Sequence, residues 1–321
     1  MHDGTAEIEA GSRPMGHLGG GWPMFVEADR TAMGRSPGPP VQEPEMFEKL
    51  GIIGGGGIAT VLLDALAHAL PAPLSRLDCL TRPGGAAKAE ASLGGYRGRV
   101  ADTVAVHDDL SVLLGCGPQL VVECAGHGAV REHGPAVLGA GIDLVVISTG
   151  ALADEALHAE LLQRADATGA RLFLPSGAVG GVDILAAARL SGIEGVVYTS
   201  RKPPQAWRGT PAERLLDLDA LASEATFFEG TARAAAREYP QNANVAATLA
   251  LAGAGFERTE VRLIADPHVW RNVHEVSVRS GCADFHVRIE GKPSPANPKT
   301  SLPTAYSIAR LVLNRVAAQV I

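Results

Sequence analysis

Aromatic residues and cysteines are scarce in this chain of 321 residues. Phe, Trp and Tyr make up 4% of it, whereas 38 glycines and several alanine-rich stretches favour closely packed helices and tight turns. The cysteines are Cys79, Cys116, Cys124 and Cys282, and no two of them form a C-x-x-C pair. Because they lie among apolar or small residues, we expect no metal site and a reduced, cytoplasmic setting.

Long apolar runs and basic stripes are missing as well. Runs such as Leu144–Ile147 fall far short of the ~20 apolar residues that a membrane span needs. Lys and Arg number 28 against 35 Asp and Glu, which gives a formal net charge of −7. We therefore expect neither a membrane nor a nucleic acid as partner, and a small-molecule substrate instead.

Residues 1–45 carry no helical or alternating pattern of apolar residues. They include the run Gly19-Gly20-Gly21 and the stretch Pro37-Gly38-Pro39-Pro40. A segment of this composition cannot bury enough apolar surface to offset its ordering entropy. It also lacks the cationic start and the run of ~7–15 apolar residues that define a signal peptide. We predict a flexible extension, and Met46 is a candidate translation start.

Between residues 46 and 175, short apolar runs alternate with helical stretches rich in alanine and leucine. Strands are expected at 50–53, 77–80, 120–124, 142–147 and 171–174. Helices are expected at 58–70, at 128–139 with an interruption at Pro135, and at 153–168 with an end at Gly169. This alternation predicts an α/β fold of the Rossmann type, with a doubly wound parallel sheet.

Residues 176–298 follow a different pattern, in which alternating strands dominate the second half. Helices are expected near 180–190, 230–238 and 243–252, and strands at 193–198, 259–265, 273–279 and 284–290. We predict a second, α+β catalytic and dimerisation domain with a mostly antiparallel sheet. Pro293, Pro295 and Pro298 mark a loop before a final helix at about 300–319. This C-terminal segment, residues 299–321, is expected to return toward the first domain.

A glycine-rich loop follows the first predicted strand. Gly54, Gly56 and Ala59 fit the G-x-G-x-x-[GA] fingerprint, in which glycines allow a tight turn and a close approach to a pyrophosphate. Four glycines alone are compatible with a merely flexible turn. The strand before them and the helix after them favour dinucleotide binding.

The second predicted strand ends without the acidic residue that usually binds the adenosine ribose. Its end reads Cys79-Leu80-Thr81-Arg82, and the nearest carboxylate, Asp78, comes too early. Arg82 is a candidate partner for a 2′-phosphate, which would allow NADP as well as NAD. An arginine on a solvated loop explains the same residue equally well.

Three further motifs follow predicted strands: VVECAGH at 121–127, STGALAD at 148–154 and SGAVGGVD at 176–183. Ligands bind at the carboxyl ends of strands in such sheets, and small residues like Ala125 and Ala178 leave room for a nicotinamide. Ordinary tight turns are the alternative for any one of the three. In the second domain, Asn244 begins a helix, where it either caps the helix or bonds a ligand amide.

Taken in order, these motifs together with NANVAATLALAG, DPHVWRNVHE and NPKTS resemble the L-aspartate dehydrogenase family over residues 47–321. The resemblance implies a homodimer and the NAD(P)-dependent oxidation of L-aspartate to iminoaspartate. That product feeds NAD biosynthesis or hydrolyses to oxaloacetate and ammonia. The family's active-site histidine falls on His274, and its nicotinamide contacts fall on Ala178 and Asn244. The N-terminal extension and Arg82 depart from a typical member.

His274 is thus the candidate acid or base, because a near-neutral pKa suits proton transfer. If its segment is a strand, Glu275 points to the opposite face, whereas Asn272 shares the face of His274. A satisfied core histidine is the structural alternative. Substrate carboxylates are expected at Lys299, Thr300 and Ser301, which we place at the start of the last helix. Plain capping by Asn297 or Thr300 is the competing interpretation.

Two other functions compete with this one. The first is an oxidoreductase of the homoserine dehydrogenase type, and the second is a catalytically silent dinucleotide-binding sensor.

Overall fold

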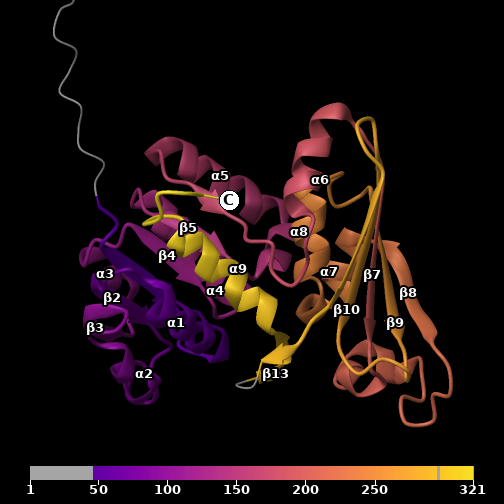
Figure 1. Ribbon diagram of the computed structural model, residues 1–321, viewed down its shortest axis with the longest axis horizontal. Coiled ribbons are helices and arrows are strands. Elements are labelled where there is room, and N and C mark those ends of the chain that lie inside the picture. The colour runs from indigo at the N-terminus through magenta and orange to yellow at the C-terminus, as the bar shows by residue number, and fades with distance from the viewer. Residues whose placement is uncertain (1–45, 295–296, 321) are drawn as a thin grey trace, which may run out of the picture. The chain divides into compact units, whose positions relative to one another are not determined.

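The computed structural model describes residues 46–294 and 297–320, without the side chains of residues 293–300. The extension predicted at residues 1–45 lies outside this range. Within it, the helices and strands form two sheets with their covering helices (Figure 1). None of the helices described combines the length and the apolar character that a membrane span requires.

The first sheet is parallel throughout and has the strand order β3-β2-β1-β4-β5-β6. Its strands are β1 Lys49–Ile53, β2 Leu74–Leu80, β3 Ala101–His107, β4 Leu120–Glu123, β5 Asp143–Val146 and β6 Leu172–Phe173. The connecting helices are α1 Gly57–Ala69, α2 Ala86–Leu93, α3 Leu110–Gly115, α4 His127–Gly139 and α5 Glu155–Thr168. The order reverses between β1 and β4, where sheets of this kind bind dinucleotides. The predicted doubly wound fold is confirmed.

Burial explains why the central strands of this sheet are almost wholly apolar. Leu50, Ile52 and Val122 are at most 1% exposed, because helices cover both faces of the sheet. The expected interruption at Pro135 is wrong, since α4 runs through it. Its buried face outweighs the one backbone hydrogen bond that a proline removes. Gly169, with a φ of 77°, ends α5 as predicted.

The second sheet has the order β11-β10-β7-β9-β8 and is mostly antiparallel, with β7 and β9 parallel. Its strands are β7 Ile193–Lys202, β8 Ala225–Thr231, β9 Thr259–Ala265, β10 Val273–Ser280 and β11 Phe285–Glu290. Helices α6 Val182–Ala188, α7 Ala232–Glu238 and α8 Asn244–Ala252 lie along one face (Figure 1). Short 3-10 helices are η1 Gly94–Tyr96, η2 Thr149–Ala153, η3 Arg189–Ser191, η4 Pro204–Trp207, η5 Pro211–Arg214 and η6 Pro240–Asn242.

Two strands of these two sheets, β3 and β8, were not predicted from the sequence. Both are edge strands, the first of one sheet and the last of the other. Edge strands expose polar side chains on their free side, so their apolar pattern is weak.

The strand register of the second sheet separates an apolar face from a charged one. On the helix-covered face, Val276 and Val278 of β10 lie opposite Tyr198 and Val196 of β7. His274 lies opposite Ser200, one step nearer the end of β7. This face is therefore apolar along most of its length and becomes polar where β7 ends.

The C-terminal segment differs from the predicted loop and helix. Residues Pro293–Ser294 (β12) and Asn297–Ser301 (β13) pair as a two-stranded ribbon, and helix α9 spans Leu302–Leu313. Prolines are tolerated in such short, edge-type strands, which leave no periodic signal in the sequence. Helix α9 (Figure 1) buries Ile308 and Val312 in the same core as Leu62 of α1.

Candidate functional site

The glycine loop lies directly after β1, and its geometry requires a glycine at position 54. Gly54 has a φ of 94° and donates its N–H to the carbonyl oxygen of Leu80, at 2.8 Å. A Cβ added there would lie 2.8 Å from the Cβ of Ala125. Gly54 therefore brings the β1 loop against the end of β4, and any side chain would separate them.

The N-terminus of α1 is open to a ligand. Its N-cap residue, Gly56, makes no side-chain capping bond, and a Cβ added there would meet no atom within 4 Å. The first turn holds no acidic residue, so no carboxylate there would repel a pyrophosphate from the free backbone N–H groups. These features fit the pyrophosphate of a dinucleotide. Ala59, by contrast, is fully buried in the core and serves close packing of the helix on the sheet.

Arg82 stands two residues beyond the end of β2 and is exposed. Thr81 before it is held in place, since its backbone N–H donates to the carbonyl oxygen of His107 at 2.8 Å. Within the described ranges no carboxylate pairs with Arg82. Its guanidinium is thus free to meet an anion at the strand end.

The carboxylate of Asp78 is already bound in a network of hydrogen bonds and ion pairs on β2 and β3. Arg76 donates to both of its carboxylate oxygens, at 2.7 and 2.8 Å, and the Nε2 of His107 lies 2.7 Å from one of them. Burial raises the pKa of Asp78, but the hydrogen bonds from Arg76 and His107 outweigh it, so the pKa lies below its usual value. A carboxylate held in this way cannot turn to a ribose, which agrees with its early position in the strand.

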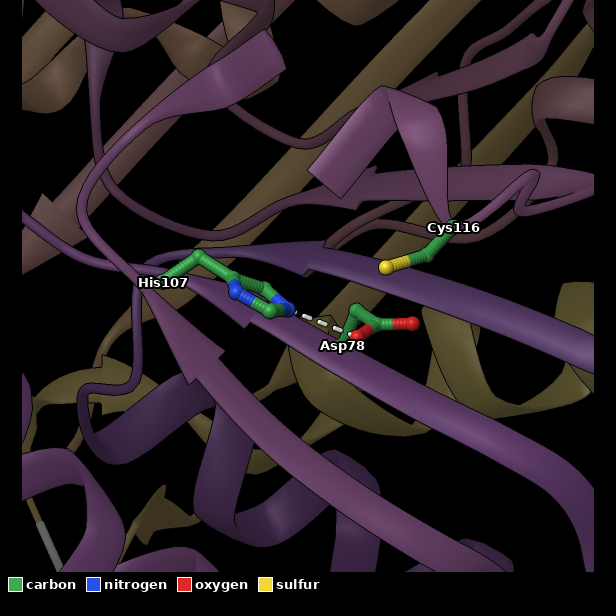
Figure 2. Close-up of side chains that lie close together, drawn as sticks. All are labelled: Asp78, His107 and Cys116. Atoms are coloured by element: carbon green, nitrogen blue, oxygen red, sulfur yellow. Dashed lines mark hydrogen bonds and ion pairs between the residues drawn. The ribbon is translucent and has the colours of Figure 1, made fainter. Parts of the chain in front are cut away.

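Asp78, His107 and Cys116 lie close enough together to be candidate metal ligands (Figure 2). Arg76 already supplies a cation to this group, because it pairs with Asp78 and its NH2 group lies 3.3 Å from the Sγ of Cys116. A metal ion would have to displace this guanidinium. The chemistry of the donor set therefore fits an ion-pair network rather than a metal centre.

A buried carboxylate that the sequence analysis did not single out organises the ends of β4 and β5. Glu123, which is 1% exposed, accepts hydrogen bonds from the backbone N–H groups of Ala125 (2.7 Å), Gly126 (2.6 Å) and Ser148 (3.0 Å). The hydroxyl of Ser148 is a fourth donor, at 3.0 Å. One sequence signal was present, since Glu123 is the only charged residue in the strand LVVE.

Asn244 joins these two loops to the second sheet's helices. It is the first residue of α8, and its Oδ1 accepts the N–H of Gly150 at 3.0 Å and lies 2.8 Å from the Nε2 of His127. The hydroxyl of Thr149 donates to the backbone carbonyl of Asn244, at 2.7 Å. The side chain therefore does not cap its own helix, and of the two roles considered for it capping is wrong.

This geometry also orients the Asn244 amide. Of the two polar atoms of the Asn244 amide, only the oxygen can accept the N–H of Gly150, so this bond identifies which atom is Oδ1. Because that oxygen only accepts, His127 must carry its proton on Nε2. The Nδ2 of Asn244 bonds neither partner and, among the described residues, remains available as a donor.

The loop after β6 brings the third motif to the second sheet. Ala178 is buried, at 8% exposure, and a Cβ added to Gly180 would lie 3.0 Å from the Cδ1 of Ile289. Ile289 pairs with His274 across β11 and β10. The SGAVGGVD loop therefore lies against the strands that carry His274.

His274 is 4% exposed, and its two ring nitrogens differ in environment. Nδ1 lies 2.8 Å from the phenol oxygen of Tyr198, whereas Nε2 is buried and has no hydrogen-bond partner among the described residues. Burial, and after it the positive charge of Lys202, lower the pKa of His274 to about 3, so the near-neutral pKa expected from the residue type is wrong for this environment. Burial raises the pKa of the Tyr198 phenol, which therefore stays protonated.

Glu275 points to the opposite face, as predicted, where Arg201 and Arg288 pair with it at 3.8 and 3.3 Å. Sequence reasoning missed Tyr198 and Lys202, because nothing in the local pattern links β7 to β10.

The structure does not place all three predicted substrate residues at the start of the last helix. Lys299 and Thr300 belong to β13, so they do not open the helix, and their side chains lie outside the described part of the chain. Ser301 is the N-cap residue of α9, is 7% exposed and makes no side-chain capping bond. Neither Asn297 nor Thr300 is the capping residue.

Comparisons with known proteins agree with the two-sheet organisation. Residues 54–175 match the family described as homoserine dehydrogenase, NAD binding domain. Residues 183–315 match the family described as aspartate dehydrogenase, C-terminal.

Individual relatives match over most of their length. The L-aspartate dehydrogenase of Polaromonas sp. is 45% identical over 276 residues, which cover 85% of this chain and 99% of that protein. The L-aspartate dehydrogenase of Ruegeria pomeroyi is 46% identical over 270 residues, covering 84% and 93%. The crystal structure of aspartate dehydrogenase from Thermotoga maritima is similar with a TM-score of 0.66 and 27% identity, covering 85% of this chain and 99% of that one.

Replacing Glu123 by Gln should destabilise the protein more than the small change in side-chain size suggests. In Glu123→Gln one acceptor oxygen becomes an NH2 group, which then faces a backbone or hydroxyl donor. We expect the free energy of unfolding to fall by ~2–3 kcal/mol, the range for a lost charged hydrogen bond and an unsatisfied buried donor. Urea denaturation measures it. Glu132→Gln on α4, where the side chain is 74% exposed, is the control and should stay within ~0.5 kcal/mol of the wild type.

Proposed function

The chain belongs to the L-aspartate dehydrogenase family, and from this we propose that it oxidises L-aspartate to iminoaspartate with NAD or NADP. The observation that carries the proposal is the buried Nε2 of His274, which no described residue hydrogen-bonds, at the polar end of a sheet face that the SGAVGGVD loop touches. Free iminoaspartate either feeds NAD biosynthesis or hydrolyses to oxaloacetate and ammonia.

Residues 46–175 would bind the dinucleotide, and residues 176–298 would supply the catalytic groups. The bound nicotinamide ring supplies the hydride acceptor. Gly54 and Gly56 leave room for the pyrophosphate, and the free Nδ2 of Asn244 is a donor suited to the carboxamide oxygen. Ala125 and Ala178 are small residues in the loops that follow β4 and β6.

His274 would take a proton from the substrate amine. Hydride can leave the α-carbon only when this amine is neutral, so the chain must provide an acceptor. If Nδ1–H donates to the phenol oxygen of Tyr198, the lone pair lies on Nε2, the nitrogen without a partner. Once Nε2 has released this proton to solvent, its lone pair can accept a proton from a water molecule that attacks the imine carbon.

The two competing functions receive less support. The match to homoserine dehydrogenase covers the dinucleotide-binding residues only, whereas residues 183–315 match aspartate dehydrogenase. A catalytically silent sensor that only binds a dinucleotide would not require a buried histidine with a free ring nitrogen. The anchoring of substrate by Lys299, Thr300 and Ser301 stays a prediction. It was expected because these residues were placed at the start of a helix, and only Ser301 lies there. A reduced cytoplasmic setting likewise stays a proposal, supported by four free cysteines.

We propose a homodimer as well. Helices cover one face of the second sheet (Figure 1). Residues on the other face, such as Ser277, Arg279 and His286, are exposed. A bare sheet face is suited to a second layer. Sedimentation velocity should give a single species of twice the chain mass of 33.2 kDa. A monomer at micromolar concentration would contradict the proposal.

Arg82 should support the use of NADP. The chain is expected to use NADP measurably beside NAD, because no carboxylate at the end of β2 is free to repel a 2′-phosphate. In Arg82→Ala, kcat/KM for NADP should fall by roughly tenfold or more, the effect of one lost charge-assisted hydrogen bond, while kcat/KM for NAD stays near the wild type. Steady-state kinetics with both cofactors measures this. Equal changes for the two cofactors, or no use of NADP at all, would count against it.

His274 should carry the chemical step rather than the fold. In His274→Gln the side-chain volume is largely kept and the base is lost, so kcat for L-aspartate should fall by ~10²–10⁴-fold. NADH affinity and Tm should stay near the wild type. His68→Gln, exposed in the last turn of α1, is the control and should keep its kcat. A folded His274 variant with most of its kcat would remove this residue from the mechanism.

A further inference from the structure

Two consecutive basic residues at the end of β7 have opposite surroundings. Arg201 lies on the charged face and is paired with carboxylates: Asp266 at 2.9 Å, Glu275 at 3.8 Å, and Glu224. Lys202 lies on the helix-covered face, and among the described residues it forms no ion pair. One of these cations is thus neutralised by the protein, and the other is not.

The contacts of Lys202 are with neutral groups. Its Nζ donates to the Oδ1 of Asn242 at 2.5 Å and lies 4.6 Å from the centre of the Trp207 ring. Trp207 is fully buried, and its ring nitrogen donates to the carbonyl oxygen of Ile264, so the platform under the ammonium is rigid. An amide and an aromatic ring stabilise a cation without neutralising it.

Leaving this ammonium without a counter-ion is unfavourable. A partly buried charge loses hydration, and a protein normally compensates with an opposite charge. Burial lowers the pKa of Lys202 to about 8, which is the sign of that unfavourable environment. At neutral pH the side chain is still mostly charged. Such a site is prepared for an anion that the protein itself does not supply.

The register places this anion beside His274. His274 lies opposite Ser200, and Lys202 follows Ser200 by two residues on the same strand, so both side chains are on one face. Diagonal neighbours in an antiparallel pair are ~7–8 Å apart, and their Cβ atoms are somewhat closer. The charge of Lys202 acts on His274, whose pKa it lowers. One small dicarboxylate can therefore reach both groups.

We propose that Lys202 binds the side-chain carboxylate of the amino-acid substrate and thereby selects L-aspartate over amino acids with neutral side chains. The proposal rests on the function proposed above. The amine then faces the Nε2 of His274, while the carboxylate meets the ammonium of Lys202. Because the Oδ1 of Asn242 accepts from Lys202, its Nδ2 is left as a second donor to the same carboxylate.

The side-chain carboxylate is chosen over the α-carboxylate on electrostatic grounds. As hydride leaves, positive charge develops on the α-carbon and its nitrogen. An ammonium on the α-carboxylate would stand one bond nearer to this charge and oppose it more strongly. An ammonium on the side-chain carboxylate selects the substrate and disturbs the reacting centre less.

The test compares L-aspartate with L-2-aminobutyrate, whose side chain is of similar size but uncharged. In Lys202→Met, kcat/KM for L-aspartate should fall by roughly 10²–10³-fold, the effect of removing one partner of a desolvated charge pair. The value for L-2-aminobutyrate should change by less than about threefold, because the lost contact is one that this substrate never makes. Lys202→Arg keeps the charge and should retain more activity with L-aspartate than Lys202→Met.

Two further measurements separate substrate binding from a structural role. Removing an unpaired cation should leave Tm unchanged or raise it. It should also raise the pKa of His274, followed by NMR of its ring protons, because the charge that lowers this pKa is gone. Lys88→Met, on the exposed side of α2, is the matched control and should alter none of these quantities with NAD as cofactor.

Equal losses with both amino acids, or an unchanged kcat/KM for L-aspartate in Lys202→Met, would overturn the assignment of Lys202. A drop in Tm without a change in the pKa of His274 would do the same. Failure of the wild type to oxidise L-aspartate would instead overturn the proposed function, so the two failures are distinguishable.

Discussion

The carboxylate of Glu123 is the constraint on which the arrangement of the site depends. It is a charge buried at the end of β4, and it is tolerated because three backbone N–H groups and one hydroxyl converge on it. Those donors belong to the loops after β4 and β5. With both loops held, Gly150 and His127 are positioned to bond Asn244, and through Asn244 the first sheet is connected to α8. A single buried carboxylate thus determines where two loops and a helix meet.

The second sheet separates its structural charges from its reactive ones by strand alternation. Odd-numbered positions at the end of β7 and the start of β10, such as Arg201 and Glu275, pair with one another on the open face. Even-numbered positions, such as Lys202 and His274, face the helices and form no ion pair with any residue in the described part of the chain. Because successive side chains of a strand point to opposite faces, this separation needs only one residue of offset. The face that packs on the helices is therefore the one suited to a charged substrate.

The ion-pair network around Asp78 shows how structure changes the interpretation of a residue type. A carboxylate near the end of the second strand usually suggests a ribose contact. Here Arg76 and His107 hold it inside the sheet, so that Thr81 and the exposed Arg82 are the groups left at the strand end. These loop residues, and not the acid, are therefore the groups that the end of β2 presents.

The amino-acid sequence by itself determined the parallel sheet, the glycine loop, the order of the motifs and most of the second sheet's strands. These features rest on local apolar periodicity and on the conformational freedom of glycine, both of which act within a few residues. It did not reveal the edge strands β3 and β8 or the ribbon before α9, where the pattern is weak. Only the tertiary structure decided which side chains meet. His127 bonds a residue 117 positions away and Tyr198 one 76 positions away, and the four donors around Glu123 include two from another strand's end. Contacts of this range follow from strand order and register, which no local pattern encodes.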